Sequence, residues 1–433
     1  MINIENINSS DTKIGILGAG KSGIAASKLA SYLGFDVLLS DSNNDIDKIS
    51  INGVQFESGR HSKKILGCNF IIKSPGIPND SIIIKNINKK KIPIVSEIEF
   101  ASWFSTSPII GVTGTNGKTT TVNLIHKIFC DAGFNSMVGG NIGVPFSDNV
   151  YKEISAKDHN GIHILELSSF QLEHITHLSL EVACILNISE DHLDRYNHFN
   201  QYIEAKLNIL KTVGDSGKII YNEDDKILNK RMINNNNVIP FRSDDIKNNN
   251  LKLDTIPLKG SHNHSNISAA LAIAKIYNID ANISKHVIAK FNPLPHRLEY
   301  LLTFNHTRIY NDSKATNLDS MMAAIDTFND NIIMIIGGID KGKTDFYQAL
   351  KKYSDKIIFI ACYGQSGESI FNQLKNHIKS SYSKDFSEAV SNAISQCKGD
   401  DILLFSPGCA SYDQFNSYVE RGDKFKEIIY GLS

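Results

Sequence analysis

The stretch Gly114–Thr120, with the sequence Gly-Thr-Asn-Gly-Lys-Thr-Thr, constrains this chain more than any other feature. We predict a buried strand before it, from Pro108 to Val112, and a helix after it, from Lys118 to Asp131. A glycine-rich loop in this position can turn backbone N–H groups toward phosphate oxygens, and the helix N-terminus favours the same anion. Lys118 would add a positive charge near the outer phosphates, and the Thr119 hydroxyl is suited to hold Mg²⁺.

This loop departs from the strict nucleotide-binding pattern at one position. The pattern has a glycine five residues before Gly117, whereas this chain has Val112 there, with Gly111 and Gly114 close by. A tight glycine turn alone would explain Gly114 or Gly117, but not the complete Gly-Lys-Thr-Thr run. The sequence therefore predicts a variant phosphate-binding loop.

A second glycine motif lies near the N-terminus, at Gly18–Gly23. We predict a strand at Lys13–Leu17 before it, a helix after it that reaches Leu33, and a strand at Phe35–Ser40 that ends at Asp41. Glycine spacing of this kind, with an acid about 20 residues on, is the Rossmann dinucleotide fingerprint. The alternative is a tight turn between strand and helix. The fingerprint indicates a diphosphate at a helix N-terminus, and a nucleotide-sugar diphosphate satisfies it as well as NAD does.

Length and charge narrow the class of protein. A chain of 433 residues is too long for one ordinary core, so we expect two or three domains. The formal net charge of -1 gives no overall field that would favour nucleic acid or an anionic membrane. Six cysteines without a Cys-x-x-Cys pair indicate reduced thiols. The N-terminal residues do not resemble a signal peptide and no apolar run is long enough to cross a bilayer, so we expect a soluble cytoplasmic protein.

Strand and helix signals alternate along the whole chain, which predicts an α/β fold with parallel sheets. We expect three domains: a Rossmann-like domain at 1–101, a central P-loop ATPase-type domain with a parallel sheet at 102–292, and a C-terminal Rossmann-like domain at 293–433. The linkers would be Ser102–Ser107 and the two-proline segment Phe291–Arg297. Beyond those already named, the predicted strands cover residues 54–56, 70–73, 92–95, 162–167, 182–188, 308–310, 332–336, 357–361 and 402–405.

Polar residues follow several of these strands, and ligands bind at the carboxyl ends of strands in an open parallel sheet. Glu166 and His192 would therefore face the phosphates. For His192, a metal or phosphate role and an ordinary surface position are equally supported by the residues alone. The spacing of Lys206, on a helix predicted at about 198–211, indicates only a solvated lysine. Asn263 and Asn266 precede a helix predicted at 267–277, and either could cap it.

Taken together these stretches resemble the Mur ligase family, the ATP-dependent amide-forming enzymes of peptidoglycan assembly, over nearly the full length and in the family's order. Thr113–Thr119 is similar to the family's nucleotide loop. Three further stretches resemble the members that add D-glutamate: Glu166–Leu172, Asn311–Asn317, and Ser406–Phe415 with Glu420–Asp423 after it. Folylpolyglutamate synthases share the central loop but not these stretches.

The resemblance implies a reaction in which ATP phosphorylates the terminal carboxylate of UDP-N-acetylmuramoyl-L-alanine and the amine of D-glutamate then displaces phosphate. It implies ATP and two Mg²⁺ ions as cofactors, small-molecule substrates, no nucleic-acid or membrane partner, and a monomer. By resemblance, ATP is bound by Gly114, Thr115, Asn116, Gly117, Lys118, Thr119, Thr120, Asn263, Asn266, Arg297 and Asp312. The metal residues are Thr119, Glu166, His192 and Lys206, with Lys206 carbamylated, and Lys118, Glu166, His192 and Lys206 are catalytic.

The same resemblance assigns the other two substrates. The UDP-linked substrate is bound by Ser22, Asp41, Ser42, Asn141 and Ser168, and D-glutamate by Lys314, Thr316, Lys341, Ser411 and Tyr418. Tyr418 stands where family members often carry phenylalanine. The length of the glycine loop leaves Lys343 as the alternative to Lys341.

Two other functions remain for comparison, besides a Mur-type ligase for another amino acid. A dinucleotide-dependent oxidoreductase would use Gly18–Gly23 but would leave the Lys118 loop, Glu166 and His192 without a role. A non-catalytic nucleotide-binding regulator would not need the polar clusters of the C-terminal domain. Phosphate release that requires both an acyl acceptor and an amine separates all three.

Overall fold

The computed structural model describes residues 2, 4, 7–44, 46, 49–157, 159–193, 195–196, 198–232, 237–249, 251, 256–340 and 344–432. The chain forms two compact units. The first comprises Met1–Ile188, His198–Asn250 and Ser265–Ile288, and the second comprises Ser189–Asn197, Leu251–His264 and Ala289–Ser433.

The first unit begins with a five-stranded parallel sheet in the order β3-β2-β1-β4-β5. Its strands are β1 (Lys13–Leu17), β2 (Asp36–Ser40), β3 (Val54–Glu57), β4 (Phe70–Lys73) and β5 (Ile94–Ser96), and its helices are α1 (Lys21–Tyr32), α2 (Ile82–Lys89) and α3 (Glu97–Ser102). The central strands are apolar and buried, as expected where helices cover both faces of a parallel sheet. Strand order reverses between β1 and β4, which places the Gly18–Gly23 loop at the switch point.

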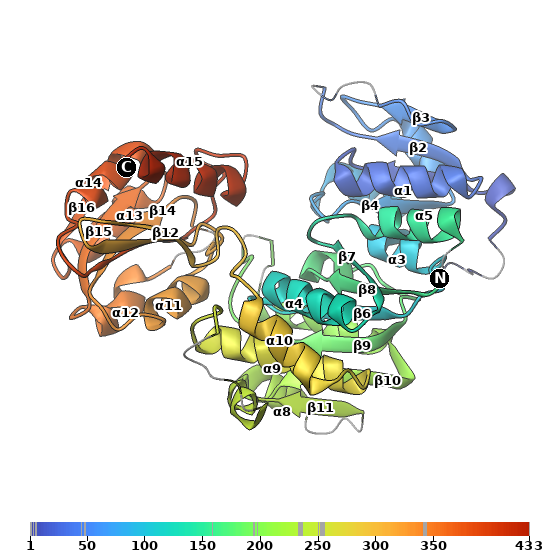
Figure 1. Cartoon of the computed structure of the whole chain (residues 1–433). Coiled ribbons are helices and arrows are strands. Elements are labelled where there is room, and N and C mark those ends of the chain that lie inside the picture. The colour runs from blue at the N-terminus through green and yellow to red at the C-terminus, as the bar shows by residue number, and fades with distance from the viewer. Residues whose placement is uncertain are drawn as a thin grey trace. The chain divides into compact units, whose positions relative to one another are not determined.

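The same unit contains a six-stranded parallel sheet in the order β11-β10-β9-β6-β8-β7 (Figure 1). Its strands are β6 (Ile109–Thr113), β7 (Asn135–Gly140), β8 (Gly161–Glu166), β9 (Leu180–Ile185), β10 (Val213–Asn222) and β11 (Val238–Phe241). The helices of this part of the chain are α4 (Lys118–Asp131), α5 (Phe146–Ala156), α6 (Ser169–Leu172), α7 (Phe199–Leu207), α8 (Lys226–Met232), α9 (Ser261–Ile276) and α10 (Ala281–Lys290). Because β6 lies between β9 and β8, the loop after β6 has the ends of both neighbours beside it.

The second unit contains a six-stranded sheet in the order β12-β13-β17-β14-β15-β16, parallel except for the edge strand β12. Its strands are β12 (Glu299–Phe304), β13 (Thr307–Asn311), β14 (Ile332–Gly337), β15 (Ile357–Tyr363), β16 (Ser380–Ser383) and β17 (Ile402–Gly408). Its helices are α11 (Leu318–Asp326), α12 (Phe346–Leu350), α13 (Gly367–Leu374), α14 (Phe386–Ile394) and α15 (Tyr418–Tyr430).

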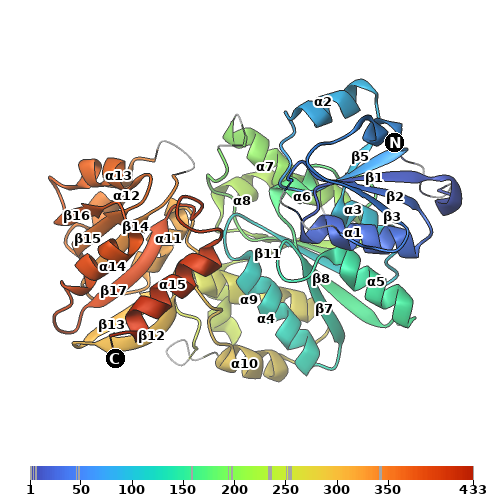
Figure 2. The same cartoon turned by 90° about the horizontal axis from the view of Figure 1, so that it is seen from above.

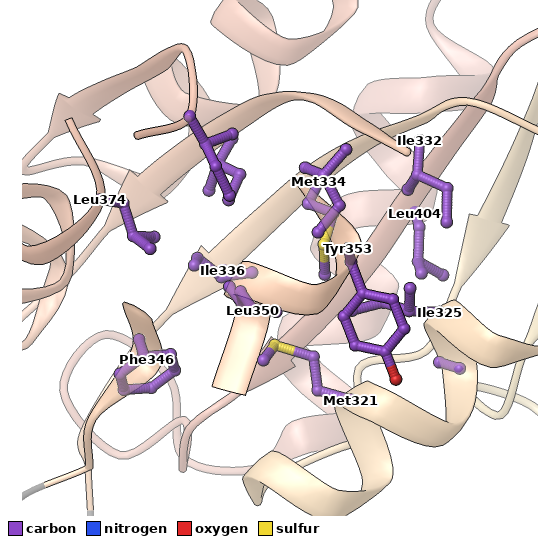
Figure 3. Close-up of a cluster of buried hydrophobic side chains, with 14 of the residues drawn as sticks. Met321, Ile325, Ile332, Met334, Ile336, Phe346, Leu350, Tyr353, Leu374 and Leu404 are labelled. Atoms are coloured by element: carbon purple, nitrogen blue, oxygen red, sulfur yellow. The ribbon is translucent and has the colours of Figure 1, made fainter. Parts of the chain in front are cut away.

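Alternate residues of these strands face two separate cores, one on each side of the sheet. On one side α11, α12 and α13 pack on Met334, Ile336 and Leu404, and Figure 3 shows Met321 and Phe346 among these side chains. On the other side α14 and α15 pack on the opposite-facing residues of β14 and β17 (Figure 2). Burial on both faces explains why β14 and residues 402–405 of β17 are apolar without interruption.

The predicted α/β fold class with parallel sheets is confirmed. The helix predicted at Lys118–Asp131 has those bounds, whereas the domain boundaries remain predictions.

The capping prediction for Asn263 and Asn266 is wrong, because α9 begins at Ser261 and both asparagines lie inside it. Sequence patterns missed β7, β10, β11, β12 and β16. Strands β7, β10 and β16 carry glycine or polar residues, β11 contains Pro240, and all five lie at a sheet edge or next to an edge strand. Within the described residues, no helix has the length and apolarity to cross a membrane.

Candidate active site

The phosphate-binding loop joins the end of β6 to the start of α4, as predicted. Gly117 has a φ of +86°, and a side chain there would place its Cβ 2.2 Å from the Asn266 Oδ1 atom. Glycine is therefore required at this position both for the backbone conformation and for the close approach of Asn266. The first-turn N–H groups of α4 point out of the helix N-terminus behind this loop, which favours an anion there.

Two lysine side chains converge on one carbonyl of the loop. The Lys118 Nζ donates to the carbonyl oxygens of Gly114 and Thr115, both at 2.7 Å. The Lys206 Nζ, from α7, donates to the same Gly114 oxygen at 2.8 Å and lies 4.7 Å from the centre of the Tyr202 ring. Lys206 is buried, so the sequence-based interpretation of a solvated helix lysine is wrong. The fold places two amines at the phosphate loop.

A carboxylate and a hydroxyl lie side by side at the same edge of the central sheet. Glu166, the last residue of β8, accepts hydrogen bonds from the Thr119 Oγ1 and the Asn141 Nδ2, each at 2.8 Å. Oxygen ligands of this kind fit Mg²⁺, which typically takes one or two protein oxygens together with phosphate oxygens and water. Among the described residues there is no group of three or more His, Cys, Asp or Glu side chains that would hold a metal by themselves.

At the first sheet, Asp41 follows β2 and closes the Gly18–Gly23 loop. Its Oδ2 accepts from the Ala19 N–H at 2.6 Å and its Oδ1 from the Asn43 N–H at 2.9 Å. Ser22 is the second residue of α1, and Ser42 is exposed directly after Asp41. The acid that the fingerprint predicts therefore lies at the glycine loop.

Ser168 has a local structural role at the end of β8. It is the N-cap of α6, its hydroxyl accepts from the Gln171 N–H at 3.3 Å, and the Gln171 side chain accepts from the Ser168 N–H at 2.9 Å. This capping box orders the backbone next to Glu166.

His192 lies in the second unit, whereas Glu166 and Lys206 lie in the first. Its φ is +56°, its backbone N–H donates to Asp191 at 2.8 Å, and its Nε2 lies 3.7 Å from the Asp191 carboxylate. The Asn317 Nδ2 donates to the same carboxylate at 3.3 Å. A joint metal site of His192 with the residues of the first unit stays a prediction.

Backbone hydrogen bonds join the three polar loops of the second unit. The Gly408 N–H donates to the Ala315 carbonyl at 2.9 Å, which links the Asn311–Asn317 loop to the loop after β17. Ile339 and Ala410 exchange two hydrogen bonds, at 2.8 and 2.9 Å, which link that second loop to the glycine loop after β14. The fold therefore places the three polar loops next to one another, whereas a shared ligand site stays a prediction.

Two of the residues predicted to bind D-glutamate are in direct contact. The Lys314 Nζ lies 3.8 Å from the centre of the Tyr418 ring, a cation–π contact that tyrosine makes as well as the more usual phenylalanine. Ser411 is buried and Thr316 half-buried in the joined loops. Lys341, with its alternative Lys343, lies outside the described residues.

Arg421 is a residue of this site that sequence reasoning missed. It is fully buried, and its guanidinium donates to the Ser313 hydroxyl at 3.0 Å, the Ser313 carbonyl at 2.8 Å and the Cys409 carbonyl at 3.0 Å. It also donates to the Tyr363 hydroxyl at 3.2 Å. One cation therefore ties α15 to two of the three loops, whereas an arginine in a helix pattern normally indicates an exposed residue.

Asp312 directly follows β13 and is buried. Burial raises the pKa of its carboxyl to about 7, against hydrogen bonds from the Ser406 hydroxyl and the Leu298 N–H that act in the other direction. Asn263 and Arg297 line a cavity of about 700 Å³ in the same unit, with Lys259, Tyr310 and others. Two residues predicted to bind ATP thus share one cavity.

Comparisons with known proteins agree with these observations. A family model described as the Mur ligase middle domain matches residues 112–245, and one described as the Mur ligase, glutamate ligase domain matches residues 296–409. Among curated proteins, the UDP-N-acetylmuramoylalanine--D-glutamate ligase of Christiangramia forsetii is 36% identical over 97% of this chain and 99% of its own. The ligase of the same name from Clostridioides difficile is 35% identical over 97% of this chain and 98% of its own.

Solved structures share the fold at low identity. The MurF ligase from Thermotoga maritima in complex with ADP is 15% identical, with a TM-score of 0.62 over 100% of this chain and 98% of that one. The UDP-N-acetylmuramate-alanine ligase MurC from the same organism is 18% identical, with a TM-score of 0.60 over 98% and 100%. The chain belongs to the Mur ligase family and, within it, groups with the UDP-N-acetylmuramoylalanine--D-glutamate ligases.

Proposed function

We propose that this protein joins D-glutamate to UDP-N-acetylmuramoyl-L-alanine and converts ATP to ADP and phosphate. A carboxylate is a poor electrophile, so its oxygen first attacks the γ-phosphorus of ATP and ADP leaves. The D-glutamate amine then attacks the carbonyl carbon of the resulting acyl phosphate, and phosphate leaves with the electron pair of the broken C–O bond. The protein's part is to align the reactants and to stabilise negative charge.

The observation that carries this proposal is the arrangement around the Gly114–Thr120 loop. The Lys118 and Lys206 amines both donate hydrogen bonds to the Gly114 carbonyl. The hydrogen-bonded pair of Thr119 and Glu166 lies at the first turn of α4. In this proposal Lys118 turns from the loop carbonyls toward the phosphates when ATP binds. A cation in a water-poor site stabilises the charge of phosphoryl transfer by several kcal/mol.

Mg²⁺ would be held at Thr119 and Glu166, where it would neutralise phosphate charge and align the phosphoryl group. Asn141 would keep Glu166 oriented through its amide hydrogen bond. His192, with the modified Lys206, would complete a second ion site. Because each of these side chains contributes oxygen or imidazole nitrogen, the set is suited to a hard divalent cation.

Lys206 would act as a carbamate, formed when its neutral amine attacks CO₂ and loses a proton. Lys118 and Lys206 both donate to the Gly114 carbonyl, so removal of the positive charge from one of them relieves like-charge repulsion. The carbamate carries a negative charge and two oxygens, so it can bind Mg²⁺, whereas a protonated lysine has no lone pair to offer. The buried position of Lys206 beside Lys118 supports this modification.

D-Glutamate would bind at the joined loops of the second unit. It carries two carboxylates, so its site needs cations and hydroxyls, which Lys314, Lys341, Thr316 and Ser411 supply, with the Tyr418 ring beside Lys314. The UDP end of the other substrate would bind at Ser22, Asp41 and Ser42, and its reacting end at Asn141 and Ser168. The adenosine end of ATP would enter the cavity that Asn263 and Arg297 line. Asn266 and Asp312 would make further contacts with ATP.

The test is phosphate release from ATP with UDP-N-acetylmuramoyl-L-alanine and a panel of amino acids. We expect release only when both the UDP-linked substrate and D-glutamate are present. Faster turnover with another amino acid would show a different Mur-type ligase. Activity that needs no amino acid would contradict ligation altogether.

The expected monomer is checked by the molar mass in solution, with and without substrates.

A further inference from the structure

We propose that Asn187 is a positioning residue for the phosphate loop and supports it where the first glycine of the strict pattern is replaced by Val112. This inference rests on the proposed function, in which that loop binds the phosphates of ATP. Asn187 follows strand β9 and belongs to the same unit as the loop.

The pairing of β6 with β9 continues past both strands and into the loop. The Leu186 N–H donates to the Thr113 carbonyl at 3.0 Å, and the Thr115 N–H donates to the Asn187 carbonyl at 2.9 Å. Gly114 lies between these two bonds with a φ of +153°, and a side chain there would place its Cβ 3.0 Å from the Leu186 Cβ. The loop therefore lies flat against the residues that follow β9.

The Asn187 side chain then makes two further hydrogen bonds to one residue of the loop. Its Oδ1 accepts from the Asn116 N–H at 2.8 Å, and its Nδ2 donates to the Asn116 carbonyl at 3.1 Å. This pairing fixes the orientation of the amide, since only the oxygen can accept and only the nitrogen can donate. Asn187 thus holds both backbone groups of the residue before Gly117.

Asn187 is itself anchored from the other side. The next residue, Ile188, donates its N–H to the Asp225 carboxylate at 2.8 Å. The same carboxylate accepts the N–H groups of Ile227 and Leu228, both at 2.9 Å, at the start of α8. A capped helix therefore supports the strand end, and the strand end supports the loop.

This arrangement determines which backbone N–H groups of the loop can donate hydrogen bonds to a phosphate. The Thr115 and Asn116 N–H groups are directed to Asn187, so the phosphates are left to the residues at the start of α4. That Asn116 binds ATP stays a prediction, and we assign its backbone the role of transmitting the support of Asn187 to Gly117. Without the Asn187 side chain, the Asn116 N–H and carbonyl would lose these two hydrogen bonds, and Gly117 would be held less firmly.

The experiment compares Asn187→Ala with Asn149→Ala. Asn149 is another asparagine of the first unit, buried where Asn187 is half-buried, and its Nδ2 donates to the Val138 carbonyl at 3.0 Å; it lies in α5 and not at the end of β9. Removing two hydrogen bonds from Asn187 should weaken the binding of ADP to the free protein about thirtyfold, measured by calorimetric titration. The dissociation constant of adenosine, which lacks phosphates, should change less than about twofold, as should both dissociation constants in Asn149→Ala.

Asn187→Asp provides a second variant of nearly the same size. Its carboxylate can still accept the Asn116 N–H, but it turns an acceptor toward the Asn116 carbonyl and adds a negative charge at the phosphate loop. We expect a loss of ADP affinity at least as large as in Asn187→Ala. Wild-type ADP affinity in either folded variant, or equal weakening of ADP and adenosine, would overturn the positioning role. Both arms measure nucleotide binding without D-glutamate, so a wrong amino-acid assignment would leave this test intact.

Discussion

The two glycine loops of the first unit, Gly18–Gly23 and Gly114–Thr120, have the same arrangement of strand, loop and helix but differ in charge. Each follows a buried parallel strand, precedes a helix, and gives an N–H to a side chain just beyond the end of a neighbouring strand. At the first loop that side chain is the Asp41 carboxylate, which binds the Ala19 N–H. At the second loop it is the neutral Asn187 amide, and Lys118 and Lys206 add two amines.

The proposed function assigns a different ligand to each loop, and the difference in charge agrees with that assignment. A carboxylate in the first loop makes the site less favourable for a highly charged anion, because like charges repel. Such a loop would suit the UDP end of a substrate, whose uracil and ribose offer hydrogen-bond donors. In the second loop, Lys118 would supply positive charge for a triphosphate and for the transferred phosphoryl group. Glycine spacing alone does not distinguish these two ligands.

The largest effect should come from Lys206→Arg, which has the same charge as an unmodified lysine but cannot form the carbamate. We expect turnover to fall by roughly a thousandfold while ATP still binds. Lys211→Arg, an exposed lysine that donates to Asn208, is the matched control and should stay active. Protein equilibrated with ¹³C-bicarbonate should show a carbamate carbon signal that is absent in Lys206→Arg. A fully active Lys206→Arg enzyme would show that the reaction does not need a carbamate at residue 206.

Lys118→Ala tests the cationic character of the second loop directly. Loss of this charge should lower the rate of ATP-dependent phosphate release by about a hundredfold or more. Lys127→Ala changes an exposed lysine on the same helix, paired with Asp131, and should leave the rate unchanged. If the folded Lys118→Ala protein turned over like the wild type, the two loops would not differ in the way described.

Asp41→Asn tests the other side of the comparison. It removes the charge of the first loop and weakens the hydrogen bonds to the Ala19 and Asn43 N–H groups, so we expect the KM for the UDP-linked substrate to rise about tenfold. The KM for ATP should not change. Asp36→Asn, at the start of the strand that Asp41 follows and paired with Lys13 at the surface, serves as the control. An equal rise in both KM values would mean that Asp41 supports the whole unit and not the first loop alone.

The smallest effect concerns a contact between the parts that carry the two loops. Burial raises the pKa of Glu97, in α3, to about 7, and its Oε1 accepts the N–H of Ser147 in α5. The folded protein therefore binds this proton more tightly than the unfolded chain, so the stabilisation is complete below pH 4.5 and is lost as the pH rises through 7. Between pH 6 and 8 the free energy of unfolding should fall by about 1 kcal/mol from this group.

Urea unfolding of wild type and Glu97→Gln at both pH values measures this change. The variant has no proton to lose at residue 97. The fall in its free energy of unfolding between pH 6 and 8 should therefore be about 1 kcal/mol smaller than in the wild type. Parallel pH profiles in the two proteins would show that Glu97 does not titrate in this range.

Much of the site could be predicted from the sequence where its chemistry is local. A run of Gly-Lys-Thr between a strand and a helix places Lys118 and Thr119 at a helix N-terminus whatever the rest of the chain does, because strand, loop and helix are contiguous. The Gly18–Gly23 loop with Asp41 was found for the same reason. The members of the polar clusters after β8, β13, β14 and β17 were also identified, since parallel strands end at one edge of a sheet.

Other features depend on contacts between distant residues, and sequence patterns do not report them. Spacing indicated a solvated lysine at Lys206 and gave no reason to select Asn187 or Arg421, since each acts only through backbone groups of another segment. The sequence by itself determined the strand–loop–helix units and the residue types that meet phosphate. The tertiary structure decided which side chains support those loops and which N–H groups remain for the ligand, because those hydrogen bonds exist only once strands far apart in the chain lie next to each other.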